Sequence, residues 1–195
     1  MRVAPRYISR LRKAALLSEL HRAKTAGPLE DPVCSPDCPD IASVHKCDRF
    51  CVNASRRLSS EGDSYPLEAG ITPLVFELKK LGVFGPCWSC EGHMNPKGEM
   101  WKIPRVWFYS DSLVHVRALA ATVGRLYDTG TLSVPWQIVL GHSDPDNPET
   151  TFSLEPSQEH GVPILEKLHS DILVIAGDLE TGFSQACNKL IAHVT

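Results

Sequence analysis

The stretch that decides the fold is RVWFYSDSLVHVRALAATVGRLYDTG, residues 105–130. Its first six residues are mainly aromatic and β-branched, which is typical of a strand. Asp111 then offers an N-cap, and apolar residues recur at helical spacing until Gly130. The stretch therefore predicts a strand over 105–110, followed by a helix that ends before Gly130.

Similar patterns continue on both sides of this unit. Upstream, residues 73–81 place apolar side chains on one helical face, and residues 83–89 indicate a strand. Downstream, residues 136–140 and 150–154 indicate two strands, and a helical region over 163–193 contains a glycine that could interrupt it. The resulting order is α-β-β-α-β-β-α. Two successive strand pairs favour an α+β fold, with a mainly antiparallel sheet and helices on one face.

Composition places the chain among globular proteins and excludes several classes. Of its 195 residues, 43% are hydrophobic and 22% are charged. The net charge of −3 argues against a nucleic-acid footprint spread over the whole chain. The longest apolar run, 172–176, is far shorter than the roughly 20 residues of a membrane span. We expect no membrane span and, because no secretory signal is recognisable, a cytoplasmic location.

The charge is concentrated at the start of the chain. Residues 1–27 carry a net charge of +6, and the remaining residues carry −9. A solvated amphipathic helix with Leu11, Ala15, Leu16 and Leu20 on its inner face accounts for this segment. A targeting peptide, a nucleic-acid arm and a membrane-surface helix stay open as alternatives.

Turn-forming residues divide the chain into two parts. Residues 25–40 contain four prolines and form a loop, a helix is expected from Asp40 onward, and residues 59–64 form a linker. We expect a basic helix and a cysteine-bearing helical segment over 1–64, and the α+β domain over 65–195.

Six of the seven cysteines lie between positions 34 and 90. Four of them, Cys34, Cys38, Cys47 and Cys51, form a C-x3-C-x8-C-x3-C pattern. Residues four apart share a helical face, so two such pairs could bring four sulfurs together, as a closed tetrahedral zinc site requires. We expect zinc, with an iron–sulfur cluster as the alternative cofactor. Two disulfides and free or reactive thiols stay open as well.

A second pattern, CWSCEGH over residues 87–93, places Cys87, Cys90 and His93 at C-x2-C-x2-H spacing. A thioredoxin-like motif is disfavoured because glycine and proline follow, which start a helix poorly. A metal knuckle and a metal-free functional loop remain, since loops on a rigid scaffold often carry ionisable groups. A structural role of Cys87 and Cys90 as small buried apolar residues stays open as well. We expect Cys90, Glu91 and His93 to be catalytic. The residues expected to bind a ligand beside them are Ser89, Arg105, His142 and Asp144.

The five residues Ser-Cys-Glu-Gly-His at 89–93 resemble the Ser-Cys-Ser-Gly-Arg element of the wybutosine-synthesis tRNA methyltransferase family at three positions. They depart from it at the second serine and at the arginine, and that family's acidic N-terminal signature is missing. The resemblance covers roughly residues 71–126. It would imply an S-adenosylmethionine site near residues 89–93 and an RNA substrate.

Other signals exclude functions or leave them open. The sequence has no P-loop, Rossmann glycine motif, H-E-x-x-H or G-x-S-x-G, which argues against the enzyme classes built on them. The tryptophans Trp88, Trp101, Trp107 and Trp136 are expected in the core, with a stacking platform for a base or sugar as the alternative.

The sequence supports one main function and two alternatives. The main hypothesis is a zinc-thiolate α+β protein whose loop 89–93 binds a polar or anionic small ligand and could act on it. In the first alternative, the basic N-terminus and the metal-bound cysteine hairpin dock a protein or a nucleic acid without catalysis. The second alternative is a thiol redox sensor.

Overall fold

The computed structural model describes residues 9–25, 33–35, 37–38, 47–141, 149–158 and 164–194. Within residues 65–195, seven of the helices and strands follow the order α-β-β-α-β-β-α that the sequence predicts. They are α4 (Thr72–Lys80), β1 (Phe84–Cys90), β4 (Arg105–Ser110), α5 (Leu113–Asp128), β5 (Trp136–Leu140), β6 (Thr151–Pro156) and α6 (Leu165–Val194). The remaining described elements are α1 (Arg10–Thr25), α3 (Ala54–Leu58), β2 (His93–Met94) and β3 (Met100–Lys102).

The four-stranded sheet has the order β1-β4-β6-β5, and all of its pairings are antiparallel. Both predicted strand pairs, β1–β4 and β5–β6, are therefore confirmed. Strand β6 lies between β4 and β5 and is antiparallel to both, so β4 and β5 run in the same direction. Helix α5 connects β4 to β5 across β6.

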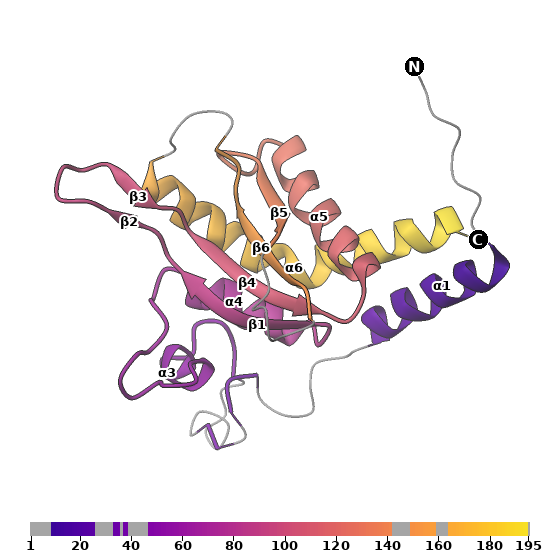
Figure 1. Cartoon of the computed structure of the whole chain (residues 1–195), viewed down its shortest axis with the longest axis horizontal. Helices are drawn as coiled ribbons and strands as arrows, with labels where there is room; N and C mark the ends of the chain where they lie inside the picture. The colour runs from indigo at the N-terminus through magenta and orange to yellow at the C-terminus, as the bar shows by residue number, and fades with distance from the viewer. Residues whose placement is uncertain are drawn as a thin grey trace.

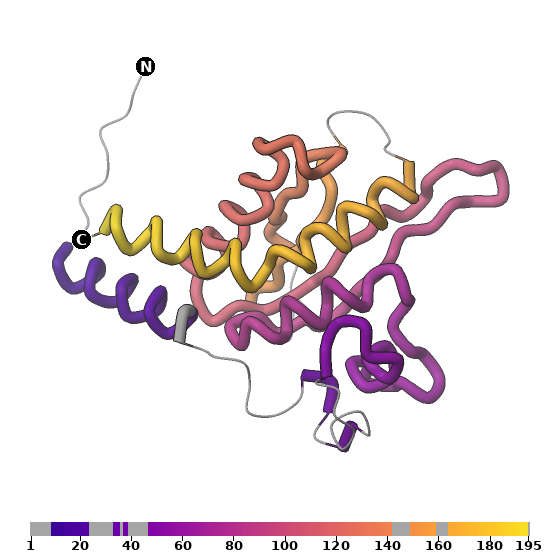
Figure 2. The backbone as a smooth tube through the Cα atoms, turned by 180° about the vertical axis from the view of Figure 1, so that it is seen from behind, coloured from indigo at the N-terminus to yellow at the C-terminus, as the bar shows by residue number. Residues whose placement is uncertain are grey.

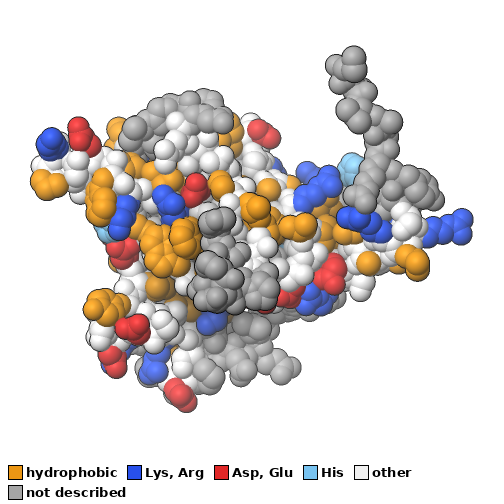
Figure 3. All heavy atoms as spheres, in the orientation of Figure 1, with side chains coloured by type: hydrophobic (Ala, Val, Ile, Leu, Met, Phe, Trp, Pro, Cys, Tyr) orange, Lys and Arg blue, Asp and Glu red, His pale blue; other side chains and the backbone are white. Residues whose placement is uncertain are grey.

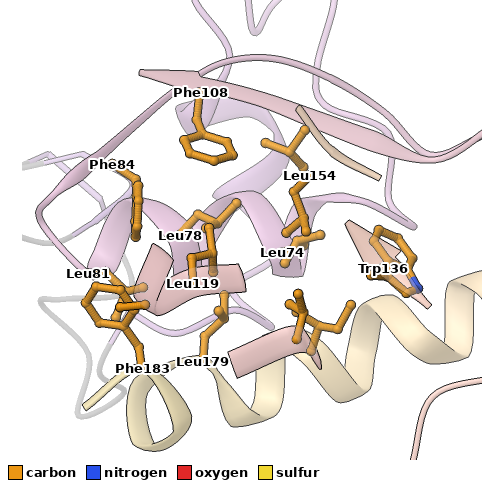
Figure 4. Packing of buried hydrophobic residues seen from close by; sticks show 14 of the residues in the cluster. Leu74, Leu78, Leu81, Phe84, Phe108, Leu119, Trp136, Leu154, Leu179 and Phe183 are labelled. Carbon is orange, nitrogen blue, oxygen red and sulfur yellow. The ribbon is translucent and has the colours of Figure 1, made fainter. Parts of the chain in front are cut away.

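The helices cover one face of this sheet, as the sequence predicts. Figures 1 and 2 show α4, α5 and α6 on the same side, and contacts join α4 to β1 and α5 to both β4 and β5. The core lies between these layers, where Phe84 meets Phe108 and Phe183 edge-to-face (Figure 4). Leu74, Leu119 and many other apolar residues complete one continuous core.

Three helix details differ from the sequence prediction, and the first is that the described residues 47–53 of the cysteine-bearing segment form turns, followed only by the short helix α3. The N-cap of α5 is Ser112, whose hydroxyl accepts a bond from the Val114 N–H, while Asp111 instead pairs with Arg22 of α1. Helix α6 continues through Gly177 without interruption. Ten buried residues along α6 hold it against the other layers, which outweighs the helix penalty of a single glycine.

The basic N-terminal helix is confirmed, but its predicted inner face is partly wrong. Leu20 is fully buried and joins the main core, whereas Leu11 is 85% exposed and Ala15 is also exposed. Helix α1 packs on α6 (Figure 2) and on α5. The Lys13 ammonium donates to the carbonyl of Val194. Only the second half of α1 therefore faces the core.

The hairpin β2–β3 was not predicted, because each strand is too short to show a period. The side chain of Asn95 closes its turn by accepting bonds from the N–H groups of Lys97 and Glu99. Gly98 supplies the positive φ of +77° that the turn needs.

Within the part of the chain that the structure describes, no helix combines the length and the apolar character needed to cross a bilayer.

Candidate functional site

The four cysteines Cys34, Cys38, Cys47 and Cys51 converge, and we call them the thiol tetrad. Their sulfurs all lie within 4.8 Å of one another. The distance from Cys34 Sγ to Cys47 Sγ is 2.9 Å, and Cys38 Sγ lies 3.9 Å from Cys51 Sγ. Four sulfurs at 2.3 Å from one ion stand about 3.8 Å apart. The tetrad could therefore hold a metal ion, as the sequence predicts.

Local turns and a small apolar cluster position the tetrad. The N–H of Cys51 donates to the carbonyl of Asp48, and the N–H of Cys38 donates to Ser35. Val33, Ala54 and Phe76 form a cluster of their own, against which Cys47 and Cys51 pack. Burial, then hydrogen bonds with Cys47 and Cys38, raise the pKa of the Cys34 thiol well above its usual value.

A β-bulge at Cys87 determines where the second cysteine pattern points. Pro86 pairs with Phe108, but the next matched pair is Trp88 with Trp107, so Cys87 is the extra residue. One added residue reverses the side of the sheet on which later side chains lie. Trp88 and Cys90 consequently project from the face opposite the helices.

A cavity of about 590 Å³ lies beside β1, the terminal strand of the sheet. Residues 58–60 and 65–68 form one wall, and residues 86–90 form another. His93 and Lys102 of the hairpin β2–β3 and Val75 of α4 complete the lining. Three sides of the cavity thus come from different segments of the chain.

Three potential ligand groups meet on the wall of this cavity. Glu68, Cys90 and His93 place a carboxylate oxygen, a sulfur and a ring nitrogen within 4.8 Å of one another. His93 Nε2 lies 2.9 Å from Glu68 Oε1. Cys90 is 3% exposed, and burial raises the pKa of its thiol, with the Gly92 N–H acting in the opposite direction.

Glu91 has a different environment from its neighbours in the loop. Its carboxylate accepts a bond of 2.7 Å from the N–H of Gly70, and its own N–H donates to Glu68 Oε2 at 2.7 Å. His169 Nε2 lies 2.9 Å from its carbonyl oxygen. These contacts join the loop to the start of α4 and to α6, and they give Glu91 a positioning role.

The predicted ligand-binding residues are only partly brought together. Ser89 lines the cavity, but Arg105 lies on the open sheet face, with its guanidinium 3.7 Å from Glu155. His142 and Asp144 lie outside the described residues. Glu68 was missed by the sequence analysis, because no motif connects it with positions 90 and 93.

The tryptophans divide between the core and the open sheet face. Trp136 is buried in the core, as expected, and its indole N–H donates to Asp171. Trp107 and Trp88 contact each other on the open face, with ring centroids 4.9 Å apart. Trp101 is also exposed and carries Lys102 over its ring. Figure 3 shows hydrophobic side chains on this face, with basic side chains beside them.

Comparison of the chain with protein-family models, with curated proteins and with solved structures gave no match. The resemblance of residues 89–93 to the methyltransferase element therefore gains no support, and the function is argued from the geometry.

Proposed function

We propose that the thiol tetrad holds a structural Zn²⁺ ion and that the cavity beside β1 binds a small polar or anionic ligand. The observation that carries the first part is the convergence of four sulfurs within 4.8 Å. That spacing suits four thiolates around one ion. In a four-iron cluster the thiolates bind different iron atoms, which requires a wider arrangement than this one.

The tetrad has the character of a structural site. All four ligands come from the protein, which leaves no open position for a substrate. The neighbouring apolar cluster is small, so bound metal would supply much of the energy that orders this segment. A salt bridge of 3.2 Å from Arg49 to the buried Glu77 links the segment to α4.

Metal analysis with a thiol count tests the tetrad. The purified protein should contain zinc, and the four tetrad thiols should react with a thiol reagent only after chelation. Cys34→Ser and Cys47→Ser should each remove this ion, whereas Cys87→Ser, a matched control on the bulge, should keep it. Equal zinc content in all of these proteins would contradict the assignment.

The cavity proposal rests on its lining. Ser60, Tyr65 and Lys102 supply hydrogen-bond donors, and Trp88 supplies an aromatic wall. Its volume is in the range of small-molecule sites. Lys102 provides the positive charge that an anionic ligand needs.

Titration with inorganic phosphate and with acetate, followed by tryptophan fluorescence, tests the cavity. At least one of these anions should change the emission of the wild-type protein. Lys102→Gln should weaken the response several-fold because it removes a cation from the wall. Lys97→Gln changes an exposed lysine in the same hairpin that does not line the cavity, so it should respond like the wild type. Equal responses in both variants would contradict the proposal.

A further inference from the structure

We propose that Glu68, Cys90 and His93 form a second, open metal site, in which Zn²⁺ keeps one coordination position directed at the cavity. This inference deepens the proposed function and rests on it, since it identifies what the cavity's ligand would bind. A small oxygen-donor anion, such as a carboxylate or a phosphate, is the chemical class that would complete the coordination.

The first argument is that three donors converge from three separate segments. Glu68 precedes α4, Cys90 ends β1, and His93 begins β2. Their donor atoms lie within 4.8 Å of one another. The bulge at Cys87 sets the face of β1 on which Cys90 lies, since Cys90 then pairs with Arg105. Bulges often re-aim a side chain beside a functional site.

The second argument is that backbone groups already orient two of the three donors. The N–H of Glu91 holds Glu68 Oε2 at 2.7 Å, which leaves Oε1 beside His93. The N–H of Gly92 donates to Cys90 Sγ at 3.4 Å. Such outer contacts fix the direction of metal ligands and favour their charged forms.

Glycine is required at position 92 for this arrangement. Its φ of +91° belongs to the region that other residues rarely adopt. A Cβ there would also approach both Leu165 and Pro104 to 2.8 Å. The loop is thus constrained to present its N–H groups toward the two ligands.

The third argument is the chemistry of the donor set. One thiolate, one imidazole and one carboxylate are all ligands of zinc, whereas magnesium and calcium prefer oxygen donors alone. Three protein ligands with a free position are typical of catalytic zinc. The three residues all line the cavity, so the free position would be reached from it. A zinc ion there would act as a Lewis acid toward an oxygen donor.

The same three residues suggest one rival arrangement. Cys90, His93 and Glu68 could act as nucleophile, base and orienting carboxylate, without a metal. We favour the metal assignment because zinc takes a thiolate, an imidazole and a carboxylate together, and these three donors lie within 4.8 Å of one another. The two arrangements differ in metal content, which an experiment can measure.

Zinc stoichiometry of the 195-residue chain is the decisive measurement. The wild type should bind two zinc ions per chain. His93→Gln and Glu68→Gln should each bind one, and Cys87→Ser should still bind two. Both Glu68 and His93 have side chains about one-third exposed, so these variants should remain folded, which circular dichroism would check. Cys34→Ser should also bind one ion, the one in the cavity.

Cobalt substitution distinguishes the two remaining ions. The ion left in Cys34→Ser should show weaker thiolate charge-transfer absorption than the ion left in His93→Gln, because it has one sulfur ligand instead of four. Adding phosphate or acetate should shift the cobalt spectrum of Cys34→Ser but not that of His93→Gln.

Two results would overturn the inference of a second metal site. Each can be distinguished from a failure of the proposed function, which concerns the tetrad zinc and the anion-binding cavity. If His93→Gln and Glu68→Gln retain the wild-type zinc content, the second site does not exist, even when the tetrad ion is lost from Cys34→Ser. If the wild type binds one ion and Cys90 alkylation slows in His93→Gln, the nucleophile arrangement is correct instead. Anion binding to the metal-free protein would then still support the cavity.

Discussion

At the scale of single residues, Glu91 shows how position changes the meaning of a side chain. Its place between Cys90 and His93 suggests acid–base chemistry. In the structure its carboxylate instead accepts the N–H of Gly70. Glu91 is not among the described residues that line the cavity. The side chain therefore connects two segments of the cavity wall, and its catalytic role stays a prediction that this placement does not favour.

We expect Glu91→Ala to lower the free energy of unfolding by about 1–3 kcal/mol, because it leaves the partly buried Gly70 N–H without its acceptor. Glu91→Gln retains an oxygen acceptor and should lose less. Urea denaturation followed by circular dichroism measures both. Neither change removes the backbone N–H that orients Glu68, so zinc content should be unchanged. Equal stability of the two variants would contradict this role.

The residue scale also shows the limit of motif analysis. Cys90 and His93 were predicted because they are close in sequence and carry reactive groups. Glu68 was not, since a lone glutamate before a helix normally has a local role, and it does accept the Thr72 hydroxyl at its carbonyl. Its carboxylate acquires a second role only where the chain folds back onto β1.

At the scale of elements, two glycines in α6 have opposite roles. Gly177 is exposed, and a Cβ there would meet only an Arg49 nitrogen at 3.7 Å. Gly182 faces α5, where a Cβ would come within 2.7 Å of Thr122 and 2.9 Å of Arg125. The second glycine lets the two helices approach closely.

We expect Gly177→Ala to stabilise the protein by about 0.5–1 kcal/mol, since alanine is the better helix former and no clash results. Gly182→Ala should destabilise it by about 1–3 kcal/mol, because a Cβ would crowd Thr122 and the ion pair between Asp178 and Arg125. Chemical denaturation of the two variants beside the wild type measures the difference. The interpretation of the α5–α6 contact would be wrong if both variants were stabilised.

Strand β1 shows why element prediction succeeded where side-chain direction did not. Its composition and the following turn predict a strand at the correct place. The bulge at Cys87 depends on the pairing of β1 with β4, which places Trp88 opposite Trp107. Without it, the side chain of Cys90 would lie on the other face of β1.

At the scale of the whole molecule, two unequal cores stabilise the chain. The main core joins α1, α4, α5, α6 and the sheet, whereas three buried residues form the cluster beside the tetrad in the part of the chain that the structure describes. The second region therefore depends on something other than apolar burial. Metal binding by the tetrad would meet this need.

We expect chelation of the metal to loosen the tetrad segment and leave the main domain folded. Hydrogen exchange measured by mass spectrometry should rise in residues 47–58 and stay unchanged in β4 and α6. The reason is that the main core buries its residues without help from the tetrad. Faster exchange throughout the chain, or none anywhere, would show that the metal has a different structural role.

The sequence by itself determined the antiparallel strand pairs, the helices on one face and the four cysteines with metal-ligand spacing. These depend on local periodicity and on residues close in the chain, which a sequence states directly. The tertiary structure alone decided that Glu68 joins Cys90 and His93, that Arg105 lies elsewhere, and that a cavity opens beside β1. Such convergence depends on how distant segments pack and on one inserted residue in a strand, and neither leaves a periodic signal in the sequence.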